Sequence, residues 1–187
     1  MPEADTRNSV LAAWRTSCLV TTGLIEGLPA PLWDASIPGI APRRTIRSMA
    51  AHLHNARSRW IRTLGTEFGI TAPRLVDRNK VTRRGLQAAL KKSGLGIERL
   101  LRLGFESGGE IPAAKAYVWR NLPLDVGHVL AYFVAHEAHH RGQLVMAARQ
   151  LGVRLPPAVR NGLWQFAARA RESAAAGVRI PSKKARS

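Results

Sequence analysis

The sequence is poor in cysteine, in long apolar runs and in acidic residues. Its one cysteine, Cys18, cannot form an intrachain disulfide or build a zinc cage of several thiolates. Any bound metal is therefore expected to have histidine and oxygen ligands. No apolar run approaches the roughly 20 residues of a membrane span, and the N-terminus lacks a secretory signal pattern. These absences predict a cytoplasmic protein that does not enter the membrane.

The scarcity of acidic residues gives the chain a strong positive charge. Lysine and arginine number 29 against 12 acidic residues, for a formal net charge of +17. Such a charge attracts nucleic acid, so a basic helical nucleic-acid-binding protein is one alternative function. However, the arginines are spread over the whole chain, and no helix-turn-helix or aromatic RNA-binding motif is present. We therefore favour a solvated basic surface, with residues 177–187 as a basic, disordered tail.

Apolar residues recur at helical spacing through most of the chain. The pattern marks four long segments, residues 9–25, 43–65, 79–103 and 123–150. A shorter fifth helix is expected from Pro156-Pro157 to about residue 175. Long connections at residues 27–43 and 104–122 separate the first helix from the second and the third from the fourth. The pattern predicts one all-α domain over residues 1–176, a four-helix bundle with two long connections and a short C-terminal fifth helix.

Glycines lie inside two of these predicted helices. Gly94 and Gly96 each cost about 1 kcal/mol relative to alanine, so a break or kink is expected in the third helix. Gly142 lies in the middle of the fourth helix. Its cost there predicts that the second helix or another subunit packs closely against it.

The fourth helix contains the main functional candidates, His136-Glu137-Ala138-His139-His140-Arg141-Gly142-Gln143. At about 100° per residue, His140 lies about 40° from His136, and Gln143 lies about 20° from it, so these three form one stripe. Two histidines one turn apart can bind one metal ion. Glu137 points about 100° away, where its carboxylate could act as an accessory base on metal-bound water or pair with an arginine.

The string His-Glu-x-x-His also occurs in zinc proteases, where two histidines bind zinc and the glutamate activates water. The extended form of that motif is absent, because its third histidine would fall at Met146. A glutamate ligand is conceivable at Glu172. Such proteases, however, place this helix against a sheet, and the sequence predicts no strands. These features argue against a protease.

The continuation of the motif resembles the DinB-like family of metal-binding four-helix proteins. The resemblance rests on His-x-x-x-His-Arg-Gly-Gln in the fourth helix, followed by an apolar stretch, Leu151-Gly152 and Pro156-Pro157. In that family a third histidine lies on the second helix, about eight residues before an aromatic residue, and His52 precedes Trp60 by that distance. The segments Ala51-His52-Leu53-His54-Asn55-Ala56-Arg57 and Gly162-Leu163-Trp164 resemble one subgroup more closely. The resemblance covers roughly residues 9–168.

The resemblance implies a divalent metal, zinc or nickel, bound by His52, His136 and His140 with water in the open position. A metal held in this way lowers the pKa of bound water or of a bound thiol. Relatives include thiol S-transferases, which use a low-molecular-weight thiol, and a maleylpyruvate isomerase. The resemblance therefore implies a metal-dependent hydrolase or thiol transferase that acts on a small molecule and forms a homodimer. A structural dimerisation protein with a vestigial metal site is a further alternative.

Several assignments remain open from the residues alone. His52 and His54 lie on opposite flanks of the second helix, so either could face the bundle interior, and only the family register favours His52. His139 is an alternate ligand that is expected nearer the surface. Arg141 and Gln143 are expected to orient the ligands from behind or to bind helix ends.

Overall fold

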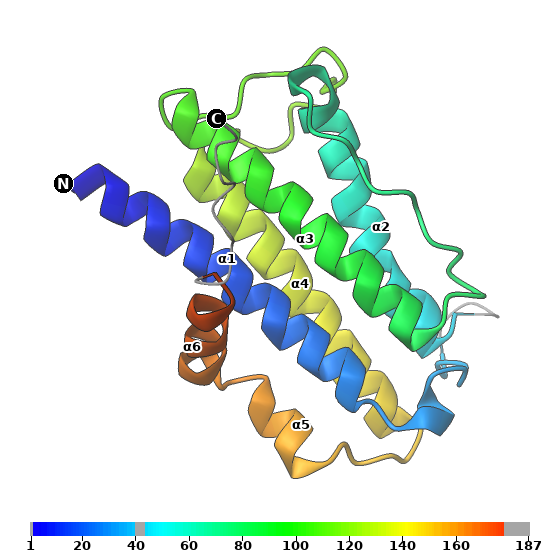
Figure 1. Cartoon of the computed structure of the whole chain (residues 1–187). Coiled ribbons are helices and arrows are strands. Elements are labelled where there is room, and N and C mark those ends of the chain that lie inside the picture. The colour runs from blue at the N-terminus through cyan, green and yellow to red at the C-terminus, as the bar shows by residue number, and fades with distance from the viewer. Residues whose placement is uncertain (1, 40–43, 178–187) are drawn as a thin grey trace, which may run out of the picture.

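The computed structural model describes residues 2–39 and 44–177, which form helices but no β-strand. Four helices are long: α1 (Pro2–Gly27), α2 (Ile46–Gly65), α3 (Arg83–Glu106) and α4 (Val126–Gln150). They pack along one another as a bundle (Figure 1). The prediction of an all-α four-helix bundle is confirmed. None of the described helices is long and apolar enough to cross a membrane.

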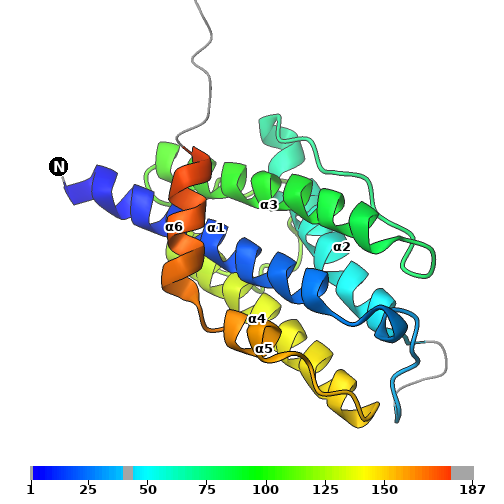
Figure 2. The ribbon, with the colours of Figure 1, turned by 60° about the horizontal axis from the view of Figure 1, so that its bottom comes forward.

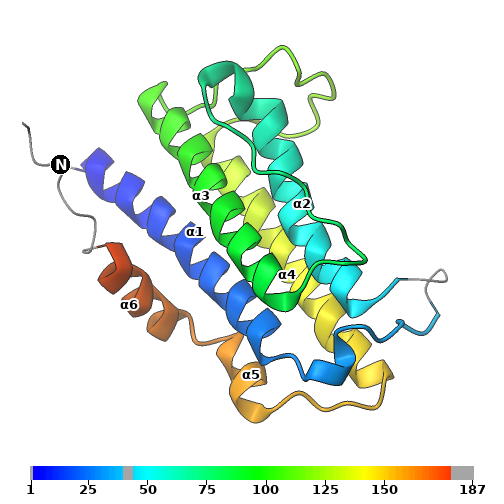
Figure 3. The same ribbon diagram turned by 45° about the vertical axis from the view of Figure 1, so that its right-hand side comes forward.

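The four long helices form two parallel pairs. α1 and α4 run in one direction, and α2 and α3 run in the other (Figure 1, Figure 3). Because α2 and α3 are parallel, residues 69–82 have to cross the length of the bundle between them. This crossing segment lies along α2, where the backbone of Val76 exchanges two hydrogen bonds with the Asn55 side chain. The two longer connections predicted from the sequence each join helices at one end of the bundle.

Side-chain caps set the starts of three long helices. Thr45 and Ser48 form a capping box at the start of α2. Thr82 accepts a hydrogen bond from the Gly85 amide at the start of α3, and Asp125 accepts one from the His128 amide at the start of α4. These side chains satisfy amides that have no partner inside the helix. As a result, the helices begin at residues 46, 83 and 126, a few residues later than residues 43, 79 and 123 predicted from apolar spacing.

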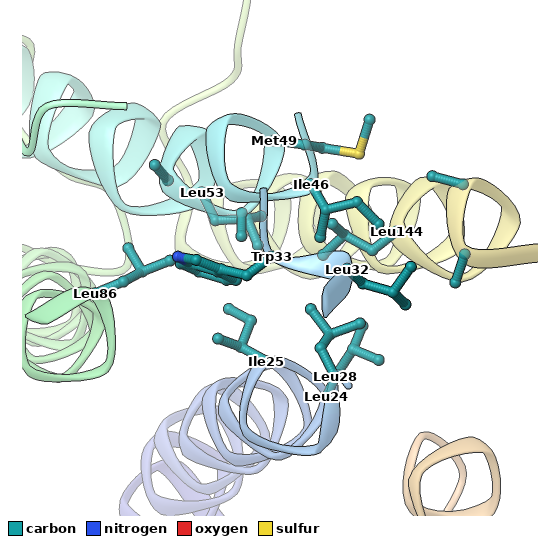
Figure 4. Packing of buried hydrophobic residues seen from close by; sticks show 14 of the residues in the cluster. Leu24, Ile25, Leu28, Leu32, Trp33, Ile46, Met49, Leu53, Leu86 and Leu144 are labelled. Carbon is teal, nitrogen blue, oxygen red and sulfur yellow. The ribbon is translucent and has the colours of Figure 1, made fainter. Parts of the chain in front are cut away.

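Two buried apolar clusters fill the bundle and fix α2 against α4. One cluster surrounds Trp33, whose indole N–H donates to the Val81 carbonyl at 3.4 Å. Leucines and isoleucines of α1 and α2 and Leu144 of α4 lie around this indole (Figure 4). The second cluster includes Trp14 and Phe133. Burial of apolar surface, at about 25 cal/mol per Å², is the main force that holds these helices together.

The C-terminal segment forms two short helices in place of the single fifth helix expected. α5 spans Pro157–Gly162, and α6 spans Phe166–Gly177 and packs on the outside of α1 (Figure 2). At Gly27 of α1, an added Cβ would lie 2.4 Å from Val159 Cγ2, so glycine allows the close approach of α5. The predicted basic tail, from residue 178 onward, lies outside the described residues.

The helical glycines of α3 and α4 differ from the expectation. α3 continues as one helix through Gly94 and Gly96. An added Cβ at Gly96 would lie 2.4 Å from Ile61 Cδ1, so this glycine allows α2 to pack closely on α3. Gly142 is exposed, and a Cβ there would meet no neighbouring described atom within 4 Å. The prediction of close packing at Gly142 is therefore wrong within the chain, because this face of α4 is turned to solvent.

Candidate metal site

Three histidines from two helices converge between α2 and α4. His52 comes from α2, and His136 and His140 come from α4; each side chain is half-buried. The ring centroids are 4.5 Å apart for His136 and His140, and 4.6 Å apart for His52 and His140. One possible ligand atom of each ring lies within 4.8 Å of those of the other two. We call these residues the histidine group.

The donor set of the histidine group fits a divalent metal ion. Imidazole nitrogen is a good ligand for zinc and nickel. Two nitrogens that bind one zinc ion at about 2.1 Å can be at most about 4.2 Å apart. Small side-chain rotations would bring the ring nitrogens, now within 4.8 Å of one another, into this range. Three protein ligands leave a coordination position for water or substrate, as in catalytic zinc sites. The group can therefore hold a metal ion that remains open to a further ligand.

Burial and mutual repulsion keep the rings neutral at physiological pH. Burial, followed by repulsion from His140 and His136, lowers the pKa of His52 to about 4. Burial and then repulsion from His140 also lower the pKa of His136 to about 4, and burial lowers the pKa of His140. A neutral imidazole has the free lone pair that a metal requires. Protons therefore compete weakly with a metal for these rings at neutral pH.

Gln143 fixes the orientation of His140. Its Oε1 lies 2.7 Å from His140 Nδ1 and accepts the ring N–H, which leaves Nε2 of His140 without a proton. The amide nitrogen of Gln143 lies 2.8 Å from Nε2 of the exposed His139 and donates to it. Gln143 therefore occupies the supporting position behind a candidate ligand. The structure places His139 beside the histidine group and not in it.

The structure places His54, the other candidate on α2, in the interface with α3. The side chain is fully buried, and its Nδ1 lies 3.1 Å from Ser93 Oγ. Its Nε2 donates to the Arg74 carbonyl at 2.9 Å. Both ring nitrogens are therefore engaged by α3 and by the crossing segment. His54 links these elements and is not brought together with the histidine group.

Glu137 lies inside the bundle, away from the expected position beside a metal-bound water. Its carboxylate is fully buried. Oε1 accepts a hydrogen bond from Arg57 Nε and forms an ion pair with the same guanidinium. Oε2 accepts a hydrogen bond from Thr21 at 2.7 Å. Because both oxygens are engaged, the structure shows the second of the two predicted roles of Glu137, pairing with an arginine, in place of an accessory base. Its offset from His136 around α4 turns it toward α1 and α2, where it balances the charge of Arg57.

Arg141 belongs to the same buried region, which we call the internal polar cluster: Ser17, Thr21, Arg57, Glu137 and Arg141. Arg141 Nη1 donates to Thr21 Oγ1 at 2.9 Å and lies 3.6 Å from Glu137. It therefore contacts α1 and does not orient a histidine ring as expected. The sequence reasoning missed Arg57. The available signal was Ser17 and Thr21 on the apolar stripe of the first helix, since buried polar side chains need partners.

Aromatic side chains border the histidine group on the side of His136. The Tyr132 ring, one turn earlier on α4, stacks on His136 with the centroids 5.9 Å apart. Trp60 of α2 donates its indole N–H to the Tyr132 hydroxyl at 3.1 Å. Tyr117 lies against Trp60 with ring centroids 6.1 Å apart. These rings form an apolar wall next to the candidate metal position.

Cationic side chains also lie near the histidine group. The charges of Arg78 and Arg44 contribute to the lowered pKa of His52, after burial and the neighbouring histidines. Arg78 Nε donates to the Ser48 carbonyl, one turn before His52 on α2, at 3.2 Å. The surroundings of His52 are therefore positive, which favours anionic ligands.

Comparison with known proteins tests the resemblance on the fourth helix. Residues 106–170 match the DinB family. This segment of the chain is DinB-like. No curated protein and no solved structure matches the chain. The matched segment includes His136 and His140 but not His52, so the place of His52 rests on the packing of α2 against α4.

Proposed function

We propose that this DinB-like chain is a metal-dependent enzyme in which His52, His136 and His140 hold a divalent ion, zinc or nickel. The observation that carries the proposal is the convergence of three neutral, half-buried imidazoles from two helices. A metal with three such ligands and one open position lowers the pKa of bound water or of a bound thiol. We infer that the reaction is a hydrolysis or the transfer of a thiol onto a small molecule.

The residues around the histidine group would bind and orient the reactants. Gln143 would keep Nε2 of His140 available by holding the proton on Nδ1. The wall that contains Tyr132 would exclude water and contact apolar parts of a substrate. Arg44 and Arg78 would favour a substrate with a negative charge.

Metal analysis of the full chain, purified without a histidine tag, tests the metal site. We expect about one ion per chain, and at least a tenfold loss of affinity in His52→Ala, His136→Ala and His140→Ala. His139→Ala is the matched control, because His139 is exposed and lies outside the histidine group, with its ring edge-on to His140 at 5.0 Å between centroids. Wild-type affinity in all three variants, or an equal loss in His139→Ala, would contradict the proposed ligands.

A second measurement separates an enzyme from a protein that merely binds a metal. In the cobalt(II)-loaded chain, added 2-mercaptoethanol should produce a sulfur-to-cobalt charge-transfer band, because the metal has an open position. His136→Ala should lack this band. If the metal binds with the expected stoichiometry but its spectrum changes neither with thiol nor with pH, the enzyme proposal fails and the metal site stands.

A further inference from the structure

A pocket at the end of α4 is lined by three arginines. Its volume is about 110 Å³. The lining consists of Val145 and Arg149 of α4, Arg154 and Leu155 of the link that follows, and Arg160 of α5. Arg149 follows His140 by nine residues, which is about 13 Å along the helix and about 180° around it. The pocket is therefore separate from the histidine group.

The three arginines of this pocket have no acidic partner among the described residues. None of the ion pairs between those residues involves Arg149, Arg154 or Arg160. Arginine stays protonated under all physiological conditions. The three side chains are exposed, so water screens their charges, but together they make the potential of this small volume positive. An anion in the pocket would lower this potential.

The backbone between the arginines is fixed by the fold. Gly152 has a left-handed φ of +74°, and its N–H donates to the Arg149 carbonyl at 3.0 Å, so the chain turns directly after α4. Leu155 is buried and anchors the link. Pro156 and Pro157 then restrict the backbone that leads to α5. Because the main chain around the pocket is already ordered, binding of a ligand requires little further ordering of it.

We propose that this pocket binds the phosphate group of a small molecule. The planar guanidinium forms paired hydrogen bonds with phosphate oxygens, which a point charge cannot do. The volume is several times that needed for one water molecule, so it suits a phosphate group more than a whole nucleotide. Val145 and Leu155 in the lining offer apolar contact to an attached carbon chain. The site depends neither on a metal nor on the proposed enzyme activity.

Calorimetric titration of the full metal-free chain with inorganic phosphate, at constant ionic strength set by chloride, tests this proposal. Wild type should bind phosphate saturably. Arg149→Gln, Arg154→Gln and Arg160→Gln should each lower the affinity about tenfold, and the triple variant should show no binding. Arg99→Gln on α3 is the control, since Arg99 is exposed, lies outside the pocket and loses the same charge. It should keep the wild-type affinity.

Three results would overturn the phosphate site. The first is the absence of phosphate binding in wild type. The second is an equal loss in Arg99→Gln, which would assign the binding to overall charge. The third is binding of an oligonucleotide or of anionic vesicles without binding of inorganic phosphate, which would assign the pocket to a macromolecular partner. His140→Ala should keep phosphate binding, and the pocket variants should keep metal binding, so that failure of one site is distinguishable from failure of the other.

Discussion

At the scale of single residues, the state of His140 depends on Gln143. The amide oxygen accepts a hydrogen bond from Nδ1–H and so leaves the lone pair of Nε2 free to bind a metal. We expect Gln143→Leu to weaken zinc binding about 10- to 100-fold, because supporting hydrogen bonds orient metal ligands and raise their basicity. Competition with a chelator measures this change. Gln143→Glu keeps an acceptor and should bind at least as tightly as wild type; unchanged affinity in Gln143→Leu would contradict the role of Gln143.

Loss of the buried pair of Glu137 and Arg57 should lower the free energy of unfolding but leave the affinity for a metal unchanged. Glu137→Gln leaves the Arg57 charge buried without a counter-charge, so we expect the free energy of unfolding to fall by about 3 kcal/mol. Urea denaturation of the metal-free chain measures the loss. The exposed pair of Arg169 and Glu172 provides the control, because Glu172→Gln should cost less than about 1 kcal/mol.

Metal binding distinguishes this structural role of Glu137 from the catalytic role predicted from the sequence. The folded Glu137→Gln variant should bind the same amount of metal as wild type, since both carboxylate oxygens already have protein partners. If Glu137→Gln kept wild-type stability but changed the pKa of the metal-bound water, that result would support Glu137 as an accessory base.

Helical spacing was enough to place His136, His140 and Gln143 on one face of α4, but it could not choose between His52 and His54. Both lie on flanks of α2, and α2 packs against α3 as well as α4. The choice depends on the crossing segment, whose Arg74 carbonyl accepts the His54 ring proton. That contact joins residues 20 positions apart through a non-helical segment. No periodicity in α2 contains this information.

At the scale of helices, Gly96 of α3 and Gly142 of α4 should respond in opposite ways to alanine. Gly96→Ala should destabilise the fold by about 1–3 kcal/mol, because the new Cβ would overlap the buried Ile61 side chain. Gly142→Ala should stabilise it by up to about 1 kcal/mol, because the site is open and alanine favours the helix. Thermal unfolding of both metal-free variants shows whether each substitution lowers or raises the stability. A destabilising Gly142→Ala would indicate that a partner, such as a second copy, covers this face.

The ends of the helices were less predictable than their existence. Apolar spacing marks the buried stripe, whereas α2 begins where Thr45 and Ser48 cap it. The division of the C-terminal segment into α5 and α6 depends on packing against α1, where Gly27 admits Val159. Such contacts join distant parts of the chain. A local pattern therefore predicted one fifth helix where the fold has two.

At the scale of the whole molecule, the stability of the metal-free chain should fall in mild acid. Histidine titrates near 6.5 in the unfolded chain, whereas burial keeps the pKa of His52 and His136 at about 4 in the fold. Between these values the unfolded chain binds more protons, so the free energy of unfolding decreases as the pH falls from about 6.5 to about 4. Urea denaturation across this range measures the slope.

A double variant isolates the part of this pH dependence that belongs to the histidine group. His52→Gln combined with His136→Gln removes two of the titrating rings while leaving neutral side chains of similar size. The slope between pH 4 and 6.5 should be smaller than in wild type. An identical slope would show that other groups govern acid stability.

The bundle as a whole followed from four amphipathic segments. Two long connections and one shorter one fit a bundle in which some neighbouring helices run parallel, but they do not say which helices these are. In the structure the shorter connection, residues 69–82, runs along α2, held by Asn55 and Val76, and joins the parallel helices α2 and α3. The length of a connection does not reveal whether it returns at one end or crosses to the other.

X-ray absorption spectroscopy of the zinc-loaded full chain tests the three-histidine site most directly. We expect the scattering of three imidazoles at about 2.0–2.1 Å and of at least one oxygen ligand in the open position. His52→Ala should reduce the imidazole contribution, because His52 is the ligand that α2 supplies. A zinc environment without imidazole scattering, or one that is unchanged in His52→Ala, would contradict the assignment of His52, His136 and His140 as the ligands.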